Sequence, residues 1–351
     1  MTSQLSKVPV SVLIPAKNEE RNLPHCLASV ARADEVFVVD SYSTDTTVEV
    51  SEAAGAKVVQ FDFNGGWPKK KNWSLENLPF RNEWVLIVDC DERIPPDLWE
   101  EIETVIQSTE YAGYYLNRKV IFLGTWIRHG GKYPDWNLRL FKHKQGRYQN
   151  LKTENIPNTG DNEVHEHVVL DGKVGYLKHD IDHIDYRDIY HWLARHNRYS
   201  NWEAGVYNNF LSDPVEPLKF AQTLLFGDPI QRKQCLRRIW VWLPFKPLLR
   251  FILFYIIQLG FLDGRAGYVY GRLLSQYEFQ IGVKLYELRQ FGGQLNREGG
   301  GEVTPSETAI SSPASSESTP TEVPPAASPA DSAENVAEPS MASEADSVGL
   351  G

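Results

Sequence analysis

The sequence has few cysteines, and those present are far apart. Cys26, Cys90 and Cys235 are the only three in 351 residues. An odd number at such wide spacing fits neither a disulfide framework nor a zinc-binding pattern. We therefore expect a protein of a reducing compartment.

Long apolar segments are also missing. Residues 1–9 are polar and lack the apolar core of a signal peptide, so we expect a cytoplasmic protein. In the apolar region near residue 250, the longest uncharged run is the twelve residues 251–262. A membrane-spanning helix needs about 20 apolar residues, so this run does not predict one.

Basic charge is absent from the C-terminal end. Residues 298–351 contain ten acids and no Lys or Arg, so the formal net charge of −10 comes from this end, and 36 acids face 36 bases in the rest. A neutral body does not favour nucleic-acid binding. The end is rich in Ser, Pro, Ala and Glu, and we expect 298–351 to be a disordered acidic tail.

Glycine-rich phosphate-binding motifs are missing as well. No G-x-G-x-x-G follows the first apolar run, and no G-x-x-x-x-G-K-[ST] occurs. We therefore expect neither a dinucleotide site of that kind nor a P-loop.

Apolar runs alternate with helical patterns over about the first hundred residues. The runs 10–14, 35–39, 56–61 and 84–88 predict buried strands, and the segments between the first three have helical spacing. This order predicts a parallel sheet with right-handed crossovers.

Polar and acidic residues follow three of these strands. They occupy 15–19, 40–45 and 89–91. Ligands bind at the carboxyl edge of such a sheet, where a carboxylate can accept a hydrogen bond from a uracil N–H or a ribose hydroxyl. Asp89 and Asp91 would repel each other unless a cation lies between them, which predicts a divalent metal ion that also holds phosphate oxygens. Turn or helix-cap chemistry is the alternative.

Three lysines precede the strand that ends at Asp89. Lys69, Lys70 and Lys71 follow Pro68 at a predicted helix start. A lysine at a helix N-terminus can help to hold a diphosphate, whereas a solvated basic face is the alternative interpretation.

As a set, these segments resemble the family 2 glycosyltransferases, which are inverting enzymes with a GT-A fold. The matching residues are 12–20, 38–45, 71–72 and 88–92. The resemblance implies an α/β fold with a mixed, mostly parallel sheet flanked by helices. It also implies a nucleotide-sugar donor, commonly a UDP-sugar, and Mg²⁺ or Mn²⁺. One departure is Lys17, where many members carry Tyr.

The resemblance also assigns residues. It implies that Asp91 binds the metal with Asp89 close by. It implies that Pro15, Asn18, Glu19 and Asp40 contact the nucleotide. We expect the same nucleotide-sugar site to include Ala16, Ser41, Asp45, Lys71 and Asp89.

The second half predicts an acceptor site. Residues 111–124 and 136–141 have strand patterns, and the segment 163–168 reads Glu-Val-His-Glu-His-Val. An inverting transfer needs a base for the acceptor hydroxyl, and we assign Glu166 to this role, with Glu163 as the rival. A His-Glu pair after a Trp-Asn-Leu-Arg-Leu-Phe segment resembles the lipopolysaccharide-core β-glucosyltransferase branch of the family. The histidines could instead be an ordinary strand pair.

Two further interpretations concern histidines and arginines. His165, His167, His179 and His183 could suggest a metal hydrolase, but no H-E-x-x-H motif occurs. Arg195 and Arg198 share one face of a helix predicted over 188–208. They could hold the diphosphate as it leaves, or form surface ion pairs.

A basic and aromatic segment follows. Residues 230–262 contain six bases and no acid, interleaved with Trp, Phe and Tyr. This composition suits helices at an anionic membrane interface, and a buried helical hairpin is the alternative. We expect a glycosyltransferase domain over 1–225, with its nucleotide-sugar half at 1–110 and its acceptor half at 111–225, a membrane-interface segment over 226–297, and the tail.

We therefore expect a metal-assisted inverting glycosyltransferase that is peripheral on the inner face of the cytoplasmic membrane. Its donor would be a nucleotide sugar and its acceptor a lipid-linked glycan or lipopolysaccharide-type molecule. One alternative is a polyprenyl-phosphate glycosyltransferase, whose anionic acceptor needs no base. Another is a membrane-bound protein that keeps this fold without catalysis.

Overall fold

The computed structural model describes residues 6–65, 67–150, 161, 167–185, 187–212, 216, 222, 223, 225 and 229–291, with backbone alone at 229–234. All of them belong to one compact unit. The predicted tail lies outside the described residues, and the predicted domain boundaries stay predictions.

The first half alternates strands and helices. Its elements are β1 (Val8–Ala16), α1 (Leu23–Ser29), β2 (Ala33–Asp40), α2 (Thr47–Ala53), β3 (Lys57–Gln60), α3 (Lys70–Asn77), β4 (Trp84–Ile87), β5 (Glu92–Arg93) and α4 (Pro96–Val105). The second half contributes β6 (Gly113–Phe122), β7 (Thr125–Trp126), β8 (Trp136–Lys142), β9 (Gly146–Tyr148), β10 (Val168–Leu170) and β11 (Val174–Ile184).

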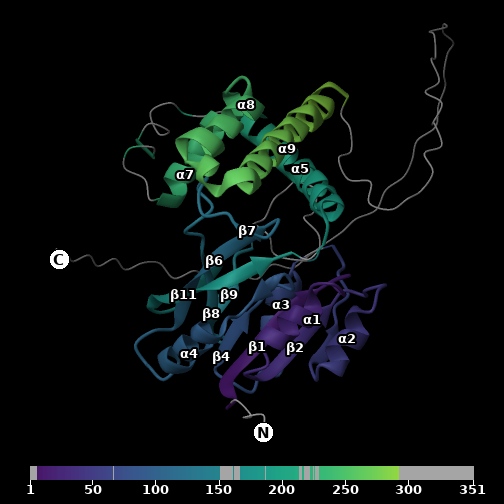
Figure 1. The fold of residues 1–351 in the computed structure, drawn as a ribbon, viewed down its shortest axis with the longest axis vertical. Helices are drawn as coiled ribbons and strands as arrows, with labels where there is room; N and C mark the ends of the chain where they lie inside the picture. Colours follow the sequence, from purple (N-terminus) through teal and green to yellow (C-terminus); the bar gives the residue numbers. More distant parts are fainter. Residues whose placement is uncertain are drawn as a thin grey trace, which may run out of the picture. The chain divides into compact units, whose positions relative to one another are not determined.

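Nine of these strands form a mixed, mostly parallel sheet, as the sequence predicts (Figure 1), and β9 and β10 pair in a separate two-stranded sheet. The order of the larger sheet is β3-β2-β1-β4-β8-β6-β11-β5, with β7 paired to β6. Strands β1 to β4 are parallel to one another, and β8 is antiparallel to both β4 and β6. β11 runs parallel to β6 and pairs with the short β5, which follows Asp91 directly. This pairing brings residues of the second half to the carboxyl edge of β4.

Period-two alternation divides the core between the two faces of the sheet. On β1, Val12 and Ile14 pack with α1 and α4 residues, whereas Leu13 packs on the opposite face. On β4, Leu86 and Ile87 separate in the same way. Because successive side chains of a strand point to opposite faces, apolar runs of this kind require cover on both sides.

Most of the described chain after β11 is helical. They are α5 (Ile189–Ser212), α7 (Pro229–Trp242), α8 (Lys246–Phe251), η1 (Ile252–Ile257), η2 (Gly260–Asp263) and α9 (Gly264–Phe291). α5 and α8 both pack against α9 (Figure 1). No single helix in the described ranges has the length and hydropathy to cross a membrane. The bent pair Lys246–Ile257 and Gly260–Phe291, with 76° between its arms, meets these criteria only when taken together.

The buried ring of Phe254 joins these helices to the sheet. It shares an apolar cluster with Phe122 and Ile127 from the β6–β7 region and Tyr270 from α9. Nearby, the backbone N–H of Gly130 donates to the carbonyl of Gln258 at 2.8 Å. The carboxylate of Asp263 accepts from the His129 backbone at 2.9 Å and lies 2.6 Å from its ring Nδ1.

The close approach of η2 and α9 leaves no room for a side chain at Gly267, which can be tested. A Cβ at this position would lie 2.1 Å from the carbonyl oxygen of Gly260. We expect Gly267→Ala to lower the free energy of unfolding by about 1–3 kcal/mol, because backbone must move. Gly282 lies in the same helix, and a Cβ added there would meet nothing within 4 Å. Gly282→Ala should be neutral or add up to ~1 kcal/mol. Denaturant unfolding of both variants measures this, and equal effects would contradict the prediction.

Candidate active site

The turn after β1 is held to the turn after β2. Asn18 has φ +54°, and its backbone N–H donates to Ser43 Oγ at 2.8 Å. Its side-chain oxygen accepts from the Thr44 N–H at 2.8 Å. The Glu19 N–H donates to Thr47 Oγ1 at 2.8 Å. The structure thus brings Pro15 to Glu19 together with residues 40–47, as predicted from the strand ends.

Two predicted nucleotide-contacting acids already serve this turn. Asp40 is fully buried at the end of β2 and accepts the Ser43 N–H at 2.9 Å. Asp45 accepts the Thr47 N–H at 3.0 Å at the start of α2 and the Glu20 N–H at 3.2 Å. Ser41 lies beside Asp40 and is buried. The two carboxylates therefore shape the turn, whatever else they bind.

Two neighbouring lysines of α3 are buried, and each reaches a different strand end. Lys70 Nζ donates to the carbonyl oxygen of Ala16 at 2.7 Å and lies 2.9 Å from the Asp161 carboxylate. Lys71 Nζ lies 3.0 Å from Asp89 Oδ1. The predicted Lys71 thus lies at this edge of the sheet beside Asp89. Lys70 lies there as well, which the sequence did not predict. A basic run at a helix start did not reveal that both side chains point inward.

Asp89 forms ion pairs with basic side chains of the protein. Arg139 Nη2 lies 2.7 Å from Asp89 and 3.0 Å from the fully buried Glu92. Burial would raise the pKa of Asp89, but the charges of Arg139 and Lys71 outweigh it and hold this pKa well below its usual value. Asp89 therefore stays ionised and anchors the strand end.

Asp91 meets a different set of partners. His183 Nε2 lies 3.3 Å and Arg195 Nη1 3.4 Å from Asp91 Oδ2. The carbonyl of Asp91 accepts the Ile184 N–H at 2.7 Å, and the β5–β11 pairing places His183 opposite Glu92. Burial would raise the pKa of Asp91, but His183 and the nearby arginines lower it well below its usual value. Burial would lower the pKa of His183, and the charge of Asp91 raises it overall.

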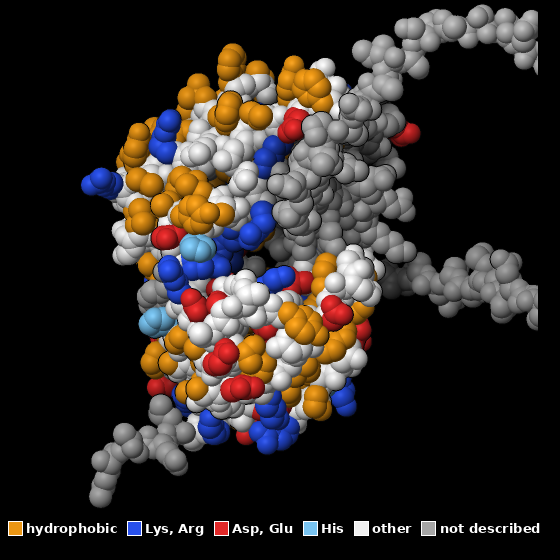
Figure 2. Space-filling view, turned by 90° about the vertical axis from the view of Figure 1, so that its right-hand side faces the viewer, with side chains coloured by type: hydrophobic (Ala, Val, Ile, Leu, Met, Phe, Trp, Pro, Cys, Tyr) orange, Lys and Arg blue, Asp and Glu red, His pale blue; other side chains and the backbone are white. Residues whose placement is uncertain are grey.

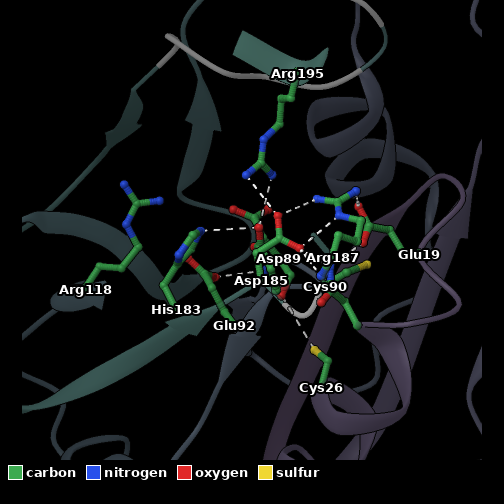
Figure 3. A network of polar contacts seen from close by, with 12 residues as sticks. Glu19, Cys26, Asp89, Cys90, Glu92, Arg118, His183, Asp185, Arg187 and Arg195 are labelled. Carbon is green, nitrogen blue, oxygen red and sulfur yellow. Dashed lines mark hydrogen bonds and ion pairs between the residues drawn. The ribbon is translucent and has the colours of Figure 1, made fainter. Parts of the chain in front are cut away.

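A second arginine, Arg187, links the acids around Asp91 to the turn after β1. Arg187 bonds Asp185 at 2.9 Å and Glu19 at 2.8 Å, and Arg195 also reaches Asp185 at 3.0 Å. In Figure 3, the side chains of His183, Arg187 and Arg195 approach the acidic group from different sides. Burial raises the pKa of Glu19 to about 7, although Arg187 acts in the opposite direction. The loop after β11 is therefore tied to the turn after β1.

The donor set at Asp91 can be tested against a divalent metal. Within the described part of the chain, no group of three or more His, Cys, Asp or Glu side chains is arranged to hold a metal ion by itself. The pair of Asp91 and His183 does converge, from two strand ends. Mg²⁺ is commonly held by one or two carboxylates together with substrate phosphates, and histidine is a frequent metal ligand. This pair therefore fits an ion that takes its other ligands from a diphosphate, and Asp89 points to Lys71 and Arg139 instead.

The remaining predicted residues are placed as follows. Arg198 is exposed on α5, one turn beyond Arg195. Glu166 and its rival Glu163 lie outside the described residues, as does His165. His179 is 2.8 Å from Glu101 of α4, away from His183 and Asp91, and His167 is exposed. The described histidines therefore do not form the cluster that a metal hydrolase would need.

Comparisons with known proteins agree with the fold. The family described as Glycosyl transferase family 2 matches residues 11–160. A Rickettsia bellii protein named as an uncharacterized glycosyltransferase is 32% identical over 211 residues, 58% of this chain and 68% of its own length. The lipopolysaccharide core biosynthesis glycosyltransferase LpsC of Rhizobium meliloti is 30% identical over 184 residues, 49% of this chain and 61% of its own length.

Solved structures are more distant. Staphylococcus aureus TarS (1–349) aligns with a TM-score of 0.36 and 16% identity, over 81% of this chain and 92% of that one. Glucosyl-3-phosphoglycerate synthase of Mycobacterium tuberculosis aligns with a TM-score of 0.27 and 24% identity, over 32% of this chain and 44% of that one.

A mixed, mostly parallel sheet with acids at its carboxyl edge and a matching sequence family defines a GT-A-fold glycosyltransferase. The chain belongs to glycosyl transferase family 2.

The two carboxylates beside Arg139 give a prediction about stability. Arg139→Gln would leave Asp89 and the buried Glu92 without their shared cation. We expect a loss of about 3–5 kcal/mol in the free energy of unfolding. As a control, Arg81→Gln removes an exposed ion pair to Asp34 and should cost less than about 1 kcal/mol. Chemical denaturation compares the two, and a small effect at Arg139 would show that the acids need no counter-charge.

Proposed function

We propose that the chain is an inverting glycosyltransferase. It moves a sugar from a nucleotide sugar, for which we propose a UDP-sugar, to a lipid-linked glycan or lipopolysaccharide-type acceptor. The observation that carries this proposal is the meeting of Asp91, His183 and Arg195 at the carboxyl edge of the sheet, beside the turn of residues 15–19. The likeness to LpsC supports the acceptor class.

The nucleotide would lie over the two joined turns. Asp40 and the turn from Pro15 to Glu19 line the ends of β1 and β2, where a carboxylate can accept hydrogen bonds from a base or ribose. Lys71 and Arg139 keep Asp89 ionised at the adjacent strand end. The donor's diphosphate would then extend toward Asp91.

Asp91 and His183 are the residues that would hold Mg²⁺ or Mn²⁺. An ion bound there would offset negative charge on the leaving diphosphate. Arg195 adds a fixed positive charge beside Asp91, and Arg187 shares the Asp185 carboxylate with it. Preorganised cations of this kind favour departure of the diphosphate because they need no rearrangement as charge develops.

Glu166 is our candidate base. In the transfer, the acceptor oxygen forms a bond to the anomeric carbon while the bond from that carbon to the diphosphate oxygen breaks. Glu166 would take the hydroxyl proton, and the nucleoside diphosphate would leave with the electron pair. Inversion follows because attack and departure occur on opposite faces of the sugar.

The donor and metal assignment predicts a linked stabilisation. UDP with Mn²⁺, at about a hundred times its dissociation constant, should add about 2.7 kcal/mol to the free energy of unfolding. Asp91→Ala should remove the part of this gain that depends on Mn²⁺, because one ligand is lost. Asp171→Ala changes an exposed carboxylate in the β10–β11 turn and should leave the gain intact. Thermal unfolding gives the comparison. No gain with UDP but a gain with another nucleoside diphosphate would change the donor.

The base assignment predicts a loss of turnover without a loss of donor binding. Glu166→Gln should lower the transfer rate by about 10²–10⁴-fold, because proton removal is lost. The stabilisation by UDP and Mn²⁺ should stay as in the unchanged protein. Glu163→Gln is the matched control and should retain most activity. If Glu166→Gln keeps full activity while Glu163→Gln does not, the roles are exchanged. If both keep it, the acceptor is already anionic, as in a polyprenyl phosphate.

A further inference from the structure

The helices after α5 carry an unusual exposed apolar surface. At the bend between η1 and α9, five apolar side chains are each between 44% and 66% exposed: Ile256, Ile257, Leu259, Phe261 and Leu262. Together we call them the bend cluster. An exposed patch of this kind commonly marks a protein or membrane contact.

The patch continues along α9. Tyr268, Phe279, Val283 and Tyr286 are exposed at helical spacing on this helix. Tyr255 links the two parts, since its ring lies 6.2 Å from that of Phe261 and 5.8 Å from that of Tyr268. The bend cluster and the exposed α9 residues therefore form one continuous surface.

Most charges beside this surface are basic, and of the two acids within α9, Glu278 is buried and Glu287 is exposed. Residues 235–277 contain six bases: Arg237, Arg238, Lys246, Arg250, Arg265 and Arg272. They contain one acid, Asp263, whose carboxylate is 4% exposed and bound to His129. On the face drawn in Figure 2, hydrophobic and Lys or Arg side chains lie next to one another across the helical part. Basic and aromatic side chains in this mixture suit an anionic interface.

A groove opens between α8 and α9 on this surface. It has a volume of about 440 Å³, and its lining includes Pro247, Tyr268, Leu273, Phe279 and Arg272. Its walls are more apolar than polar, with Ser275 and Gln276 among the lining residues, and Arg272 supplies a cation to it. An acyl chain and a neighbouring phosphate would match these two features.

From these observations we propose that the bend cluster and the exposed face of α9 dock on an anionic bilayer, with Arg265 and Arg272 at the level of lipid phosphates. A second copy of the chain fits less well, because it would present the same bases to these arginines. The surface sits next to the acceptor half, since η1 and η2 contact residues 129 and 130. The inference deepens the proposed function and rests on it for the lipid-linked acceptor, but docking itself requires no transfer.

Vesicle co-sedimentation of the full chain tests the proposal. We expect binding to vesicles with about 30% phosphatidylglycerol in phosphatidylcholine to exceed binding to phosphatidylcholine alone by at least about tenfold, and to weaken with salt. Arg265→Gln with Arg272→Gln should reduce the binding by about tenfold or more. Ile257→Ser with Leu262→Ser should reduce it by a similar factor.

Control substitutions of the same kinds lie in β10 and in the turn that follows it. Val169→Ser alters an exposed apolar residue of β10, and Lys173→Gln an exposed base, and neither should change vesicle binding. Thermal stabilisation by UDP and Mn²⁺ should be retained in every variant that still folds, which separates failed docking from a failed donor site.

Three results would overturn the proposal. One is equal binding to neutral and anionic vesicles, and another is unchanged binding of both double variants. The third is a dimer in light scattering that Ile257→Ser with Leu262→Ser converts to monomer, which would assign the surface to self-association.

Discussion

The strand end that carries the acids after β4 depends on the buried ion pairs of Arg139. One guanidinium neutralises Asp89 and Glu92, and Glu92 in turn accepts the Asp89 backbone N–H at 2.8 Å. Buried charges are tolerated only when they are paired. Because this cation comes from β8, residues 1–110 alone cannot organise the strand end that carries the acids.

The two acids of the strand end are therefore not equivalent. Asp89 faces Lys71 and Arg139, which are fixed charges of the protein. Asp91 faces His183 and Arg195, which come from a strand end and a helix beyond it. Two acids separated by one residue are thus held by different sets of partners. The Arg187 contacts to Asp185 and Glu19 then couple the surroundings of Asp91 to the turn of residues 15–19.

Much of the fold could be predicted because apolar runs with a strict period leave few alternatives. The strands at 10–14 and 84–88, the turn at 15–19 and the helix containing Arg195 all follow local patterns. The partners of Asp91 could not be predicted in this way. His183 reaches it only through the pairing of β11 with β5, and nothing local indicates that Arg187 turns toward Glu19. Lys70 was missed because a run of lysines predicts a solvated face, and its burial depends on the carbonyl of Ala16.

The shared cluster around Phe254 also determines how the chain can be divided. Phe122 and Ile127 are covered by Phe254, Tyr270 and Leu274, and His129 is bound by Asp263. Cutting the chain before α7 would expose these apolar side chains and leave the loop around Gly130 without its backbone partner. The helices therefore complete an apolar cluster with the β6–β7 region, and a shortened chain without them would expose that side of the sheet to water and to aggregation.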